Sequence, residues 1–484
     1  MSSPARLRLR AARLGATLRR VLLASLTVSA CARVHEPRPT LEIPAERSEV
    51  PRIQHHVVQR EVARPVLEPA VVQESEIVSR EVVETVMVRG GATVRAEPRP
   101  DAPALGQLAL GAAVEVYGRV DGTGCMFPWL EVAPQGFVCA RSESTSAAPT
   151  PMLPSLPGRA TLPGIYGSLT KGSKVYDSLD AALAGEGGRV PSSHLTLRRQ
   201  SATRRGSASA WKTRYGWVRE QDLRRLKPSR FHGELVEGLE QPLAWTLPPQ
   251  GTRSVLVRAT AQADAAVVAQ LGPRVARPVL EVRDGFVRVE EGWLLREQVR
   301  VARRRTAPTP VGPRERWIDV DLTEQVLVAY EGEVPVYATL VSSGRPGHRT
   351  PTGIFRISKK VAERTMNSMA DSSDRYSVDR VPWTAYFDHG YAFHAAFWHG
   401  GFGRTRSHGC VNLSPTDARA LYDWMSPAAA PGWSEVYGHE DQPGALVRLH
   451  DGQREPEWKG YAKAMHEAAA DGAGDDAPVL LARR

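Results

Sequence analysis

The chain has 484 residues, and at about 150 residues per domain this length predicts roughly three folded units with linkers. Hydrophobic residues make up 42% of the sequence, and no apolar run reaches the length of about 18 residues that would predict a membrane-spanning helix. The formal charge is +10, but six arginines lie in the first twenty residues; without them the charge is +4, which gives no support for nucleic-acid binding.

Residues 1–30 have the composition of an export signal peptide. Their arginines precede an apolar stretch at 21–28 and two small residues, after which comes Cys31. Residues 28–31 resemble a bacterial lipobox, in which Cys31 would be lipidated and would anchor the mature chain to a membrane. Ordinary signal-peptide cleavage is the alternative. Both predict a location in the cell envelope, in the periplasm.

Several segments lack sustained periodicity and predict linkers. Residues 31–85 alternate charges, Val and Pro, which indicates a flexible tether. Two shorter linkers, rich in Pro, Thr, Ser and Ala, are predicted at 143–159 and 303–313. The C-terminal tail, 451–484, predicts one helix at about 458–470 and a loose end.

An internal repeat begins near residue 86. The sequence Val-Arg-Ala at 94–96 recurs at 257–259, and the Asp-Ala and Gln-Leu pairs that follow keep the same offset of 163 residues. Each copy continues with short β-branched and aromatic segments punctuated by Gly, Pro and Asp, which predict strands. The pattern resembles bacterial SH3-like barrels and predicts modules at 86–142 and 250–302, with a divergent third module at 160–230.

Such modules often bind peptidoglycan, but a spacer that buries its own aromatic residues is an equal alternative, since fold does not fix function. The middle unit also contains a basic cluster around two tryptophans. A solvated face explains this cluster, although a basic aromatic surface would also attract anionic envelope polymers. Its members are Arg198, Arg199, Arg204, Arg205, Arg224, Arg225 and Lys227.

Two cysteines, Cys125 and Cys139, lie fourteen residues apart in the first module. An exported protein folds in an oxidising compartment, so we expect a disulfide between Cys125 and Cys139. This disulfide would leave Cys410 as the free thiol. Two independent buried thiols are the alternative.

Residues 314–450 predict a β-dominated domain. Segments 317–322 and 325–330 alternate with the period of a strand and are separated by a short turn, which indicates a hairpin. Further strands are predicted at 336–342 and 354–357, and a helix at 415–424.

This domain contains a pattern typical of a cysteine nucleophile. Cys410 lies in a glycine-flanked turn, and His394 lies sixteen residues upstream at the end of an apolar strand. A free thiol has a pKa of about 8.5, so a cysteine nucleophile needs an imidazole or oriented amides to favour its thiolate. Small residues beside Cys410 let backbone N–H groups turn toward a developing oxyanion.

His394 followed by Ser407-His408-Gly409-Cys410-Val411-Asn412 resembles the signature of the L,D-transpeptidase catalytic domain. The resemblance implies Cys410 as nucleophile, His394 as general base and the His408-Gly409-Cys410 turn as oxyanion hole. It also implies that the carbonyl of Ala395, where many members have Gly, orients the imidazole. The fold implied is a mainly β chain: a β-sandwich catalytic domain with short helices, preceded by two or three small SH3-like β-barrels.

The same resemblance suggests that an insertion at 373–388 is a loop that caps the donor-peptide site. Trp383 and Tyr386 in it are candidates for substrate contact, with packing in the domain's core as the alternative. The remaining substrate-binding candidates, around the nucleophile, are Arg406, Ser407 and Asn412.

Other classes of site fit the pattern less well. Histidines near Cys410 suggest zinc, but their spacing matches no common metal pattern, and we expect no metal or cofactor. We expect His389 and His399 to lie at the surface or behind the site. A papain-like protease is disfavoured because there the Cys precedes its His. A buried structural Cys410 explains neither the turn nor His394.

The leading hypothesis is acyl transfer. Cys410 attacks an L,D-linked stem tetrapeptide of peptidoglycan, D-Ala leaves, and the thioester passes to a diaminopimelate amine on a neighbouring stem, which cross-links the wall. Water, giving a carboxypeptidase or peptidase, or a Lys of an envelope protein are alternative acceptors. A wall-binding lipoprotein without catalysis is a hypothesis from another class.

Overall fold

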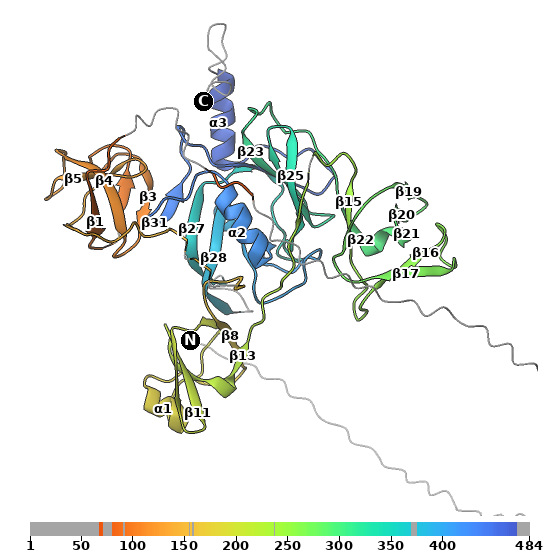
Figure 1. The fold of residues 1–484 in the computed structure, drawn as a ribbon, viewed down its shortest axis with the longest axis horizontal. Coiled ribbons are helices and arrows are strands. Elements are labelled where there is room, and N and C mark those ends of the chain that lie inside the picture. The colour runs from red at the N-terminus through yellow and green to blue at the C-terminus, as the bar shows by residue number, and fades with distance from the viewer. Residues whose placement is uncertain are drawn as a thin grey trace, which may run out of the picture. The chain divides into compact units, whose positions relative to one another are not determined.

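The computed structural model describes residues 67–70, 80–90, 92–153, 155–156, 159–236, 238–368 and 375–471 (Figure 1). Strands dominate these residues, so the mainly β fold predicted from the sequence is confirmed. The predicted signal peptide, Cys31 and most of the predicted tether lie outside the described residues. Within them, no helix is both long enough and apolar enough to cross a membrane.

The N-terminal module is a set of short antiparallel strands. They pair in the order β3-β2-β6-β5-β4-β1-β7, and the alternate residues Val86 and Val88 of β1 are fully buried in its core. A disulfide joins Cys125 to Cys139. The strands are β1 (Glu84–Val88), β2 (Thr93–Arg95), β3 (Ala104–Leu108), β4 (Ala113–Val120), β5 (Trp129–Val132), β6 (Phe137–Val138) and β7 (Ser142–Ser144).

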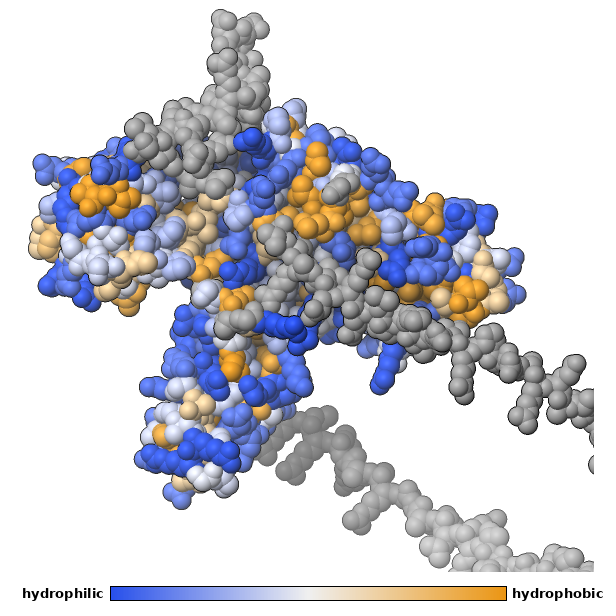
Figure 2. Space-filling model, viewed as in Figure 1, coloured by the Kyte–Doolittle hydropathy of each residue, from blue (hydrophilic) through white to orange (hydrophobic). Residues whose placement is uncertain are grey.

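The middle module combines two small sheets, β13-β8-β9 and β10-β11-β12, with one short helix. Trp211 is fully buried between them, and its indole N–H donates to Glu220 at 2.6 Å. The visible surface of this module is largely hydrophilic (Figure 2). Its elements are β8 (Tyr166–Leu169), α1 (Leu179–Ala184), β9 (His194–Arg198), β10 (Ser201–Arg205), β11 (Ala208–Thr213), β12 (Gly216–Arg219), a 3-10 turn (Glu220–Asp222) and β13 (Leu223–Arg225).

The third module has the sheets β18-β15-β22 and β17-β16-β21-β20-β19. Its strands are β15 (Leu243–Thr246), β16 (Val255–Arg258), β17 (Val267–Leu271), β18 (Ala276–Pro278), β19 (Glu281–Arg283), β20 (Phe286–Val289), β21 (Gly292–Leu295) and β22 (Val299–Ala302), with a 3-10 turn at Arg296–Gln298.

The internal repeat has the same local geometry in both copies. Strands β2 and β3 pair with a bulge at Arg95, and β16 and β17 pair with a bulge at the equivalent Arg258. The guanidinium of Arg95 donates to the carbonyl of Ala102 at 2.7 Å, and that of Arg258 donates to the carbonyl of Ala265 at 2.9 Å. The repeat therefore corresponds to a repeated hairpin, whereas the resemblance to SH3-like barrels stays a prediction.

The C-terminal domain is a sandwich of two sheets. One has the order β14-β25-β24-β23-β32-β26, and the other contains β31-β27-β28-β29-β30. Ile318 and Phe355 of the first sheet and Phe393 of the second are buried in one shared core. The elements are β14 (Glu234–Leu235), β23 (Arg316–Asp321), β24 (Val326–Glu331), β25 (Val334–Leu340), β26 (Gly353–Arg356), β27 (Lys359–Asn367), β28 (Tyr376–Asp388), β29 (Tyr391–Ala395), β30 (Val411–Leu413), α2 (Pro415–Trp424), β31 (Trp433–Tyr437), β32 (Leu446–His450) and α3 (Gly460–Asp471).

Helix α2 follows β30 directly and begins where the sequence predicts. The hydroxyl of Ser414 accepts from the backbone N–H of Asp417, and Pro415 occupies the first helical position. The C-terminal helix, predicted at about 458–470, is α3. Both helices thus form where a local start signal or an Ala-rich composition indicates one.

One expectation about a connecting segment is wrong. The predicted capping loop at 373–388 is, from residue 376 onward, the thirteen-residue strand β28, which pairs with β27 and β29. Backbone pairing with β27 and β29, which composition alone does not reveal, makes this segment a strand. In the part of the predicted tether that the structure describes, Leu67 is buried and the N–H of Ala70 donates to the carbonyl of Asp423 at 2.9 Å, while the tether itself stays a prediction.

The modules preceding the sandwich also extend its sheet. Strand β3 of the N-terminal module pairs with β31, and β9 of the middle module pairs with the start of β28. Edge strands that would otherwise present free backbone groups are thereby covered.

Candidate active site

The pairing of β29 with β30 positions the two predicted catalytic side chains. These strands are parallel, with Phe393 opposite Val411 and His394 opposite Asn412, so Cys410, one position before β30, lies beside Ala392. Successive side chains of a strand point to opposite faces. Phe393 and Val411 point into the core, and His394 and Cys410 therefore share the other face.

Cys410 is a free, partly exposed cysteine. Its Sγ lies 3.7 Å from the carbonyl oxygen of Gly390, to which the thiol donates. Burial raises the pKa of the Cys410 thiol, because the protein surroundings solvate a thiolate less well than water does. At neutral pH the resting residue is therefore a thiol.

Hydrogen bonds fix the turn that carries Cys410. The hydroxyl of Ser407 donates to the carbonyl of Cys410 at 2.5 Å and accepts from the N–H of Gly409 at 3.0 Å. Gly409 has φ +121°, and a Cβ there would lie 2.4 Å from the Tyr391 ring, so only glycine fits. At rest the Gly409 amide is therefore bonded to Ser407, which makes the amides of His408 and Cys410 the first candidates for the oxyanion role; that role stays a prediction for all three residues of the turn.

His394 is buried beneath this face, and its Nδ1–H donates to the carbonyl of Ala395 at 3.3 Å. This bond leaves Nε2 without a proton. Burial lowers the pKa of His394 to about 4, although the Ala395 carbonyl acts in the opposite direction. The imidazole is therefore neutral at pH 7 and able to accept a proton.

Ser407 and Asn412, predicted to bind substrate, are instead buried within the domain. Asn412 lies opposite His394, and its side-chain amide contacts Nε2 of His399 at 3.0 Å. Burial first, and then the positive charge of Arg406, lower the pKa of His399 to about 4. These residues support the strand pair from within. Arg406 is exposed, and its role in substrate binding stays a prediction.

The structure distinguishes the two aromatic residues that were candidates for substrate contact. Trp383 is 1% exposed and packs in the core, so its side chain is not open to substrate; packing is its role in this structure. Tyr386 pairs with Ala392 and so lies on the face that carries Cys410, with the Lys359 ammonium 5.2 Å from its ring centroid. Of the two, Tyr386 stays a candidate for substrate contact.

Sequence reasoning missed the residues that surround His408. The Arg345 guanidinium lies 2.7 Å from Nε2 of His408, and the rings of His348 and Tyr376 lie 4.7 and 5.0 Å from its ring. Arg345 and His348 lie in the segment between the predicted strands at 336–342 and 354–357, which is rich in Gly and Pro and indicates a turn. Nothing in the sequence marked Tyr376, whose position depends on β28.

His389 is exposed, as expected, with a side chain that is 93% accessible. Among the described residues, no group of three or more His, Cys, Asp or Glu side chains is arranged to hold a metal ion.

Comparison with known families identifies the domain. Residues 315–452 match the YkuD family, the L,D-transpeptidase catalytic domain. The chain therefore contains a catalytic domain of the L,D-transpeptidase type, and this is the family to which its C-terminal sandwich belongs.

Solved structures of this family are similar to part of the chain. The catalytic domain of the E. faecium L,D-transpeptidase is 23% identical, over 28% of this chain and 98% of that one, with a TM-score of 0.23. An L,D-transpeptidase from Stackebrandtia nassauensis is 25% identical, over 30% of this chain and 58% of that one, with a TM-score of 0.21. One from Mycobacterium smegmatis is 16% identical, over 46% and 99%, with a TM-score of 0.23. Comparison with curated proteins gave no match.

The resting state of the site can be tested by alkylation. Because burial raises the thiol pKa, the rate of Cys410 modification by iodoacetamide should rise with pH and reach half its maximum above about pH 8.5, the ordinary thiol value. The unfolded chain, followed by mass spectrometry at the same cysteine, should show the ordinary midpoint. A folded-state midpoint below pH 7 would contradict this arrangement and indicate a thiolate–imidazolium pair.

Proposed function

We propose that the chain is an L,D-transpeptidase that acts on peptidoglycan stem peptides through a thioester at Cys410. The observation that carries the proposal is the shared face of Cys410 and His394, which adjacent parallel strands create. Membership of the L,D-transpeptidase family, which acts on peptidoglycan, supports it.

In the first step, Cys410 Sγ attacks the carbonyl carbon of the L,D-linked peptide bond in a stem tetrapeptide. Nε2 of His394 accepts the thiol proton as the S–C bond forms, because both groups are neutral at rest. General-base assistance of this kind contributes typically about 100-fold to 10,000-fold in rate. The Ala395 carbonyl holds the imidazole in the tautomer that leaves Nε2 free.

The tetrahedral intermediate carries a negative oxygen, for which the backbone amides of His408 and Cys410 are the proposed donors, each contributing roughly 3 kcal/mol. When the intermediate collapses, the C–N bond breaks and the leaving D-Ala amine takes the proton from His394. Cys410 then carries a thioester. Ser407 keeps the turn in place throughout by bonding both Gly409 and Cys410.

A diaminopimelate side-chain amine on a second stem is the proposed acceptor. It attacks the thioester, His394 accepts its proton, and the released thiolate is reprotonated, so a cross-link forms and the enzyme is regenerated. Water or a protein lysine would resolve the same thioester to a shortened stem or to an attached protein. A wall-binding lipoprotein would form no thioester.

Replacement of Cys410 tests these alternatives in cells. A Cys410→Ala chain, expressed in a strain without other L,D-transpeptidases, should lose the cross-links between diaminopimelates, because no thioester can form. His389→Ala, at an exposed residue, should keep them. Muropeptide profiling measures both; loss of tripeptide or of attached protein instead of cross-links would identify water or lysine as acceptor, and an unchanged profile would exclude catalysis through Cys410.

We also propose that Cys31 anchors the mature chain to a membrane in the cell envelope, which the residues before it support. In fractionated cells, Cys31→Ala should move the protein from the membrane fraction to the soluble periplasmic fraction. A single acyl chain alone gives weak binding, whereas a lipidated terminus bearing several chains is firmly held. Unchanged membrane association of the variant would remove the anchor assignment.

A further inference from the structure

The ring of His408, in the turn that carries Cys410, contacts three side chains. The Arg345 guanidinium lies 2.7 Å from its Nε2, and because a guanidinium can only donate hydrogen bonds, this nitrogen accepts. The ring of His348 lies 4.7 Å away, and that of Tyr376 lies 5.0 Å away. Two of these side chains come from the loop that precedes β26, whereas the third belongs to β28.

The loop that precedes β26 also holds the turn directly through hydrogen bonds to its backbone. The N–H of Arg345 donates to the carbonyl of Ser407 at 3.0 Å, and the hydroxyl of Thr350 donates to the carbonyl of Gly409 at 2.7 Å. The contact from Tyr376 differs, because the position of this residue depends on what holds the start of β28.

A strand of the middle module holds the start of β28. Strand β9 runs parallel to it, with His194 opposite Tyr376, and the N–H of His194 donates to the carbonyl of Arg375 at 2.9 Å. Leu195 and Leu197 of β9 are buried in the module's own core, which fixes β9 in turn. Tyr376 therefore takes its position from the middle module as well as from the catalytic domain.

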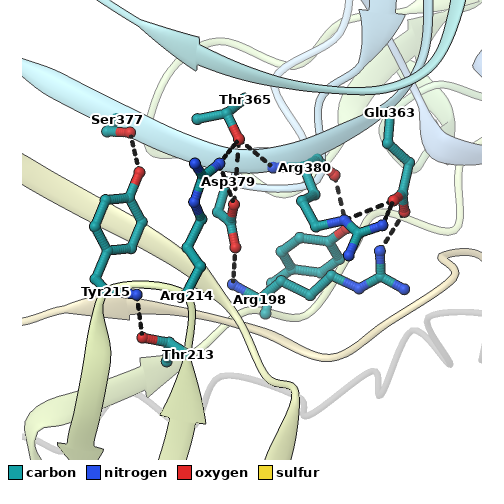
Figure 3. Close-up of polar contacts among 10 residues, drawn as sticks. Arg198, Thr213, Arg214, Tyr215, Glu363, Thr365, Ser377, Asp379 and Arg380 are labelled. Atoms are coloured by element: carbon teal, nitrogen blue, oxygen red, sulfur yellow. Dashed lines mark hydrogen bonds and ion pairs between the residues drawn. The ribbon is translucent and has the colours of Figure 1, made fainter. Parts of the chain in front are cut away.

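Side chains of the module bond the residues of β28 that follow, as Figure 3 shows. Tyr215 shares a hydrogen bond of 2.9 Å with Ser377, the residue directly after Tyr376. The Arg214 guanidinium lies 3.5 Å from the carboxylate of the buried Asp379. The module thus contacts β28 through its side chains as well as through its backbone.

Further contacts support the bend of β28 at Arg380, which has φ +48°. Residues other than glycine rarely adopt a positive φ, so this conformation needs support from its surroundings. The Tyr166 hydroxyl donates to the carbonyl of Arg380 at 2.9 Å, and the Tyr166 ring lies 4.1 Å from that of Phe397 in the catalytic domain. Glu363 forms ion pairs with Arg380 and with Arg198, a member of the basic cluster of the middle module.

We propose that Tyr376 is a positioning residue of the active site and that the middle module holds it against His408. The inference rests on the proposed function, in which the amides of His408 and Cys410 stabilise an oxyanion. Such donors act only when they point to the place where the charge develops, and a misplacement of about 1 Å can cost roughly 100-fold in rate. The Tyr376 ring keeps His408, and with it both amides, in one orientation. The middle module is therefore part of the catalytic unit, rather than a spacer.

Two reagents distinguish this role from a general structural one. Acylation of Cys410 by the carbapenem meropenem passes through an oxyanion, whereas alkylation by iodoacetamide does not. In the full chain, Tyr376→Ala should slow acylation about tenfold and leave alkylation unchanged, because only acylation depends on the orientation of the amides. Tyr376→Phe, which keeps the ring, should acylate at the wild-type rate. Mass spectrometry of the peptide containing Cys410, over a time course, measures both rates.

The contribution of the module is measured in the same assay. Tyr166→Phe combined with Tyr215→Phe removes two hydrogen bonds to β28, keeps both rings, and should slow acylation about threefold. In a chain that already has Tyr376→Ala, the same pair should cause no further loss, because the module acts through the Tyr376 ring. Tyr176→Phe is the matched control, since Tyr176 packs in a core cluster within the module, and it should acylate like wild type.

Equal acylation of wild type and Tyr376→Ala would overturn the inference, as would an equal loss of acylation and alkylation, which would indicate general disruption of the site. A Tyr376→Phe chain as slow as Tyr376→Ala would also overturn it, because the hydroxyl and not the ring would then matter. An unchanged rate in the Tyr166 and Tyr215 double variant, or an additive loss in the triple variant, would overturn the role of the module. Failure of wild type to acylate at Cys410 would instead overturn the proposed function.

Discussion

The parallel pairing of β29 with β30 is the constraint on which the proposed catalytic site depends. It aligns His394 with Asn412 and brings Cys410 beside Ala392, and strand alternation then gives the two reactive side chains one face. The opposite face of the same strands is apolar core, so a slip by one residue would remove Phe393 from that core and put a polar side chain such as His394 in its place. The same strand pairing therefore determines both the packing of the sandwich and the position of the site.

Burial has a chemical consequence at this site. Desolvation lowers the pKa of His394 and raises that of Cys410, so both shifts favour the neutral thiol and the neutral imidazole over an ion pair. A base that is free of its proton and a nucleophile that keeps its proton until attack suit a mechanism in which proton transfer accompanies bond formation. The Ala395 carbonyl contributes by selecting the tautomer, and any residue supplies a carbonyl, which explains why Ala is acceptable there.

Local sequence signals were sufficient to predict the elements whose structure depends on local interactions. The Ser414 cap with Pro415 predicts α2, and the alternating segments predict β23 and β24. Strand β28 was missed because Arg380 and Trp383 adopt positive φ, which interrupts its alternation. The hydrogen bond from the Gly409 N–H to Ser407 is local, but it depends on the geometry of the turn, which the residue types do not specify. The pairing of β9 with β28 is a tertiary contact between two segments that share no sequence signature. The predicted roles of Cys410 and His394 rest on their spacing, which is itself the sequence signature.

The most direct test is to trap the acyl-enzyme with its own substrate. Purified full-length chain should be mixed with a diaminopimelate stem tetrapeptide without an acceptor, quenched in acid and digested, and the peptide containing Cys410 analysed by mass spectrometry. The account predicts that this peptide gains the mass of the tetrapeptide less D-Ala, in an adduct that hydroxylamine removes. Release of D-Ala with the adduct on another residue, or turnover by Cys410→Ser at the wild-type rate, would contradict it.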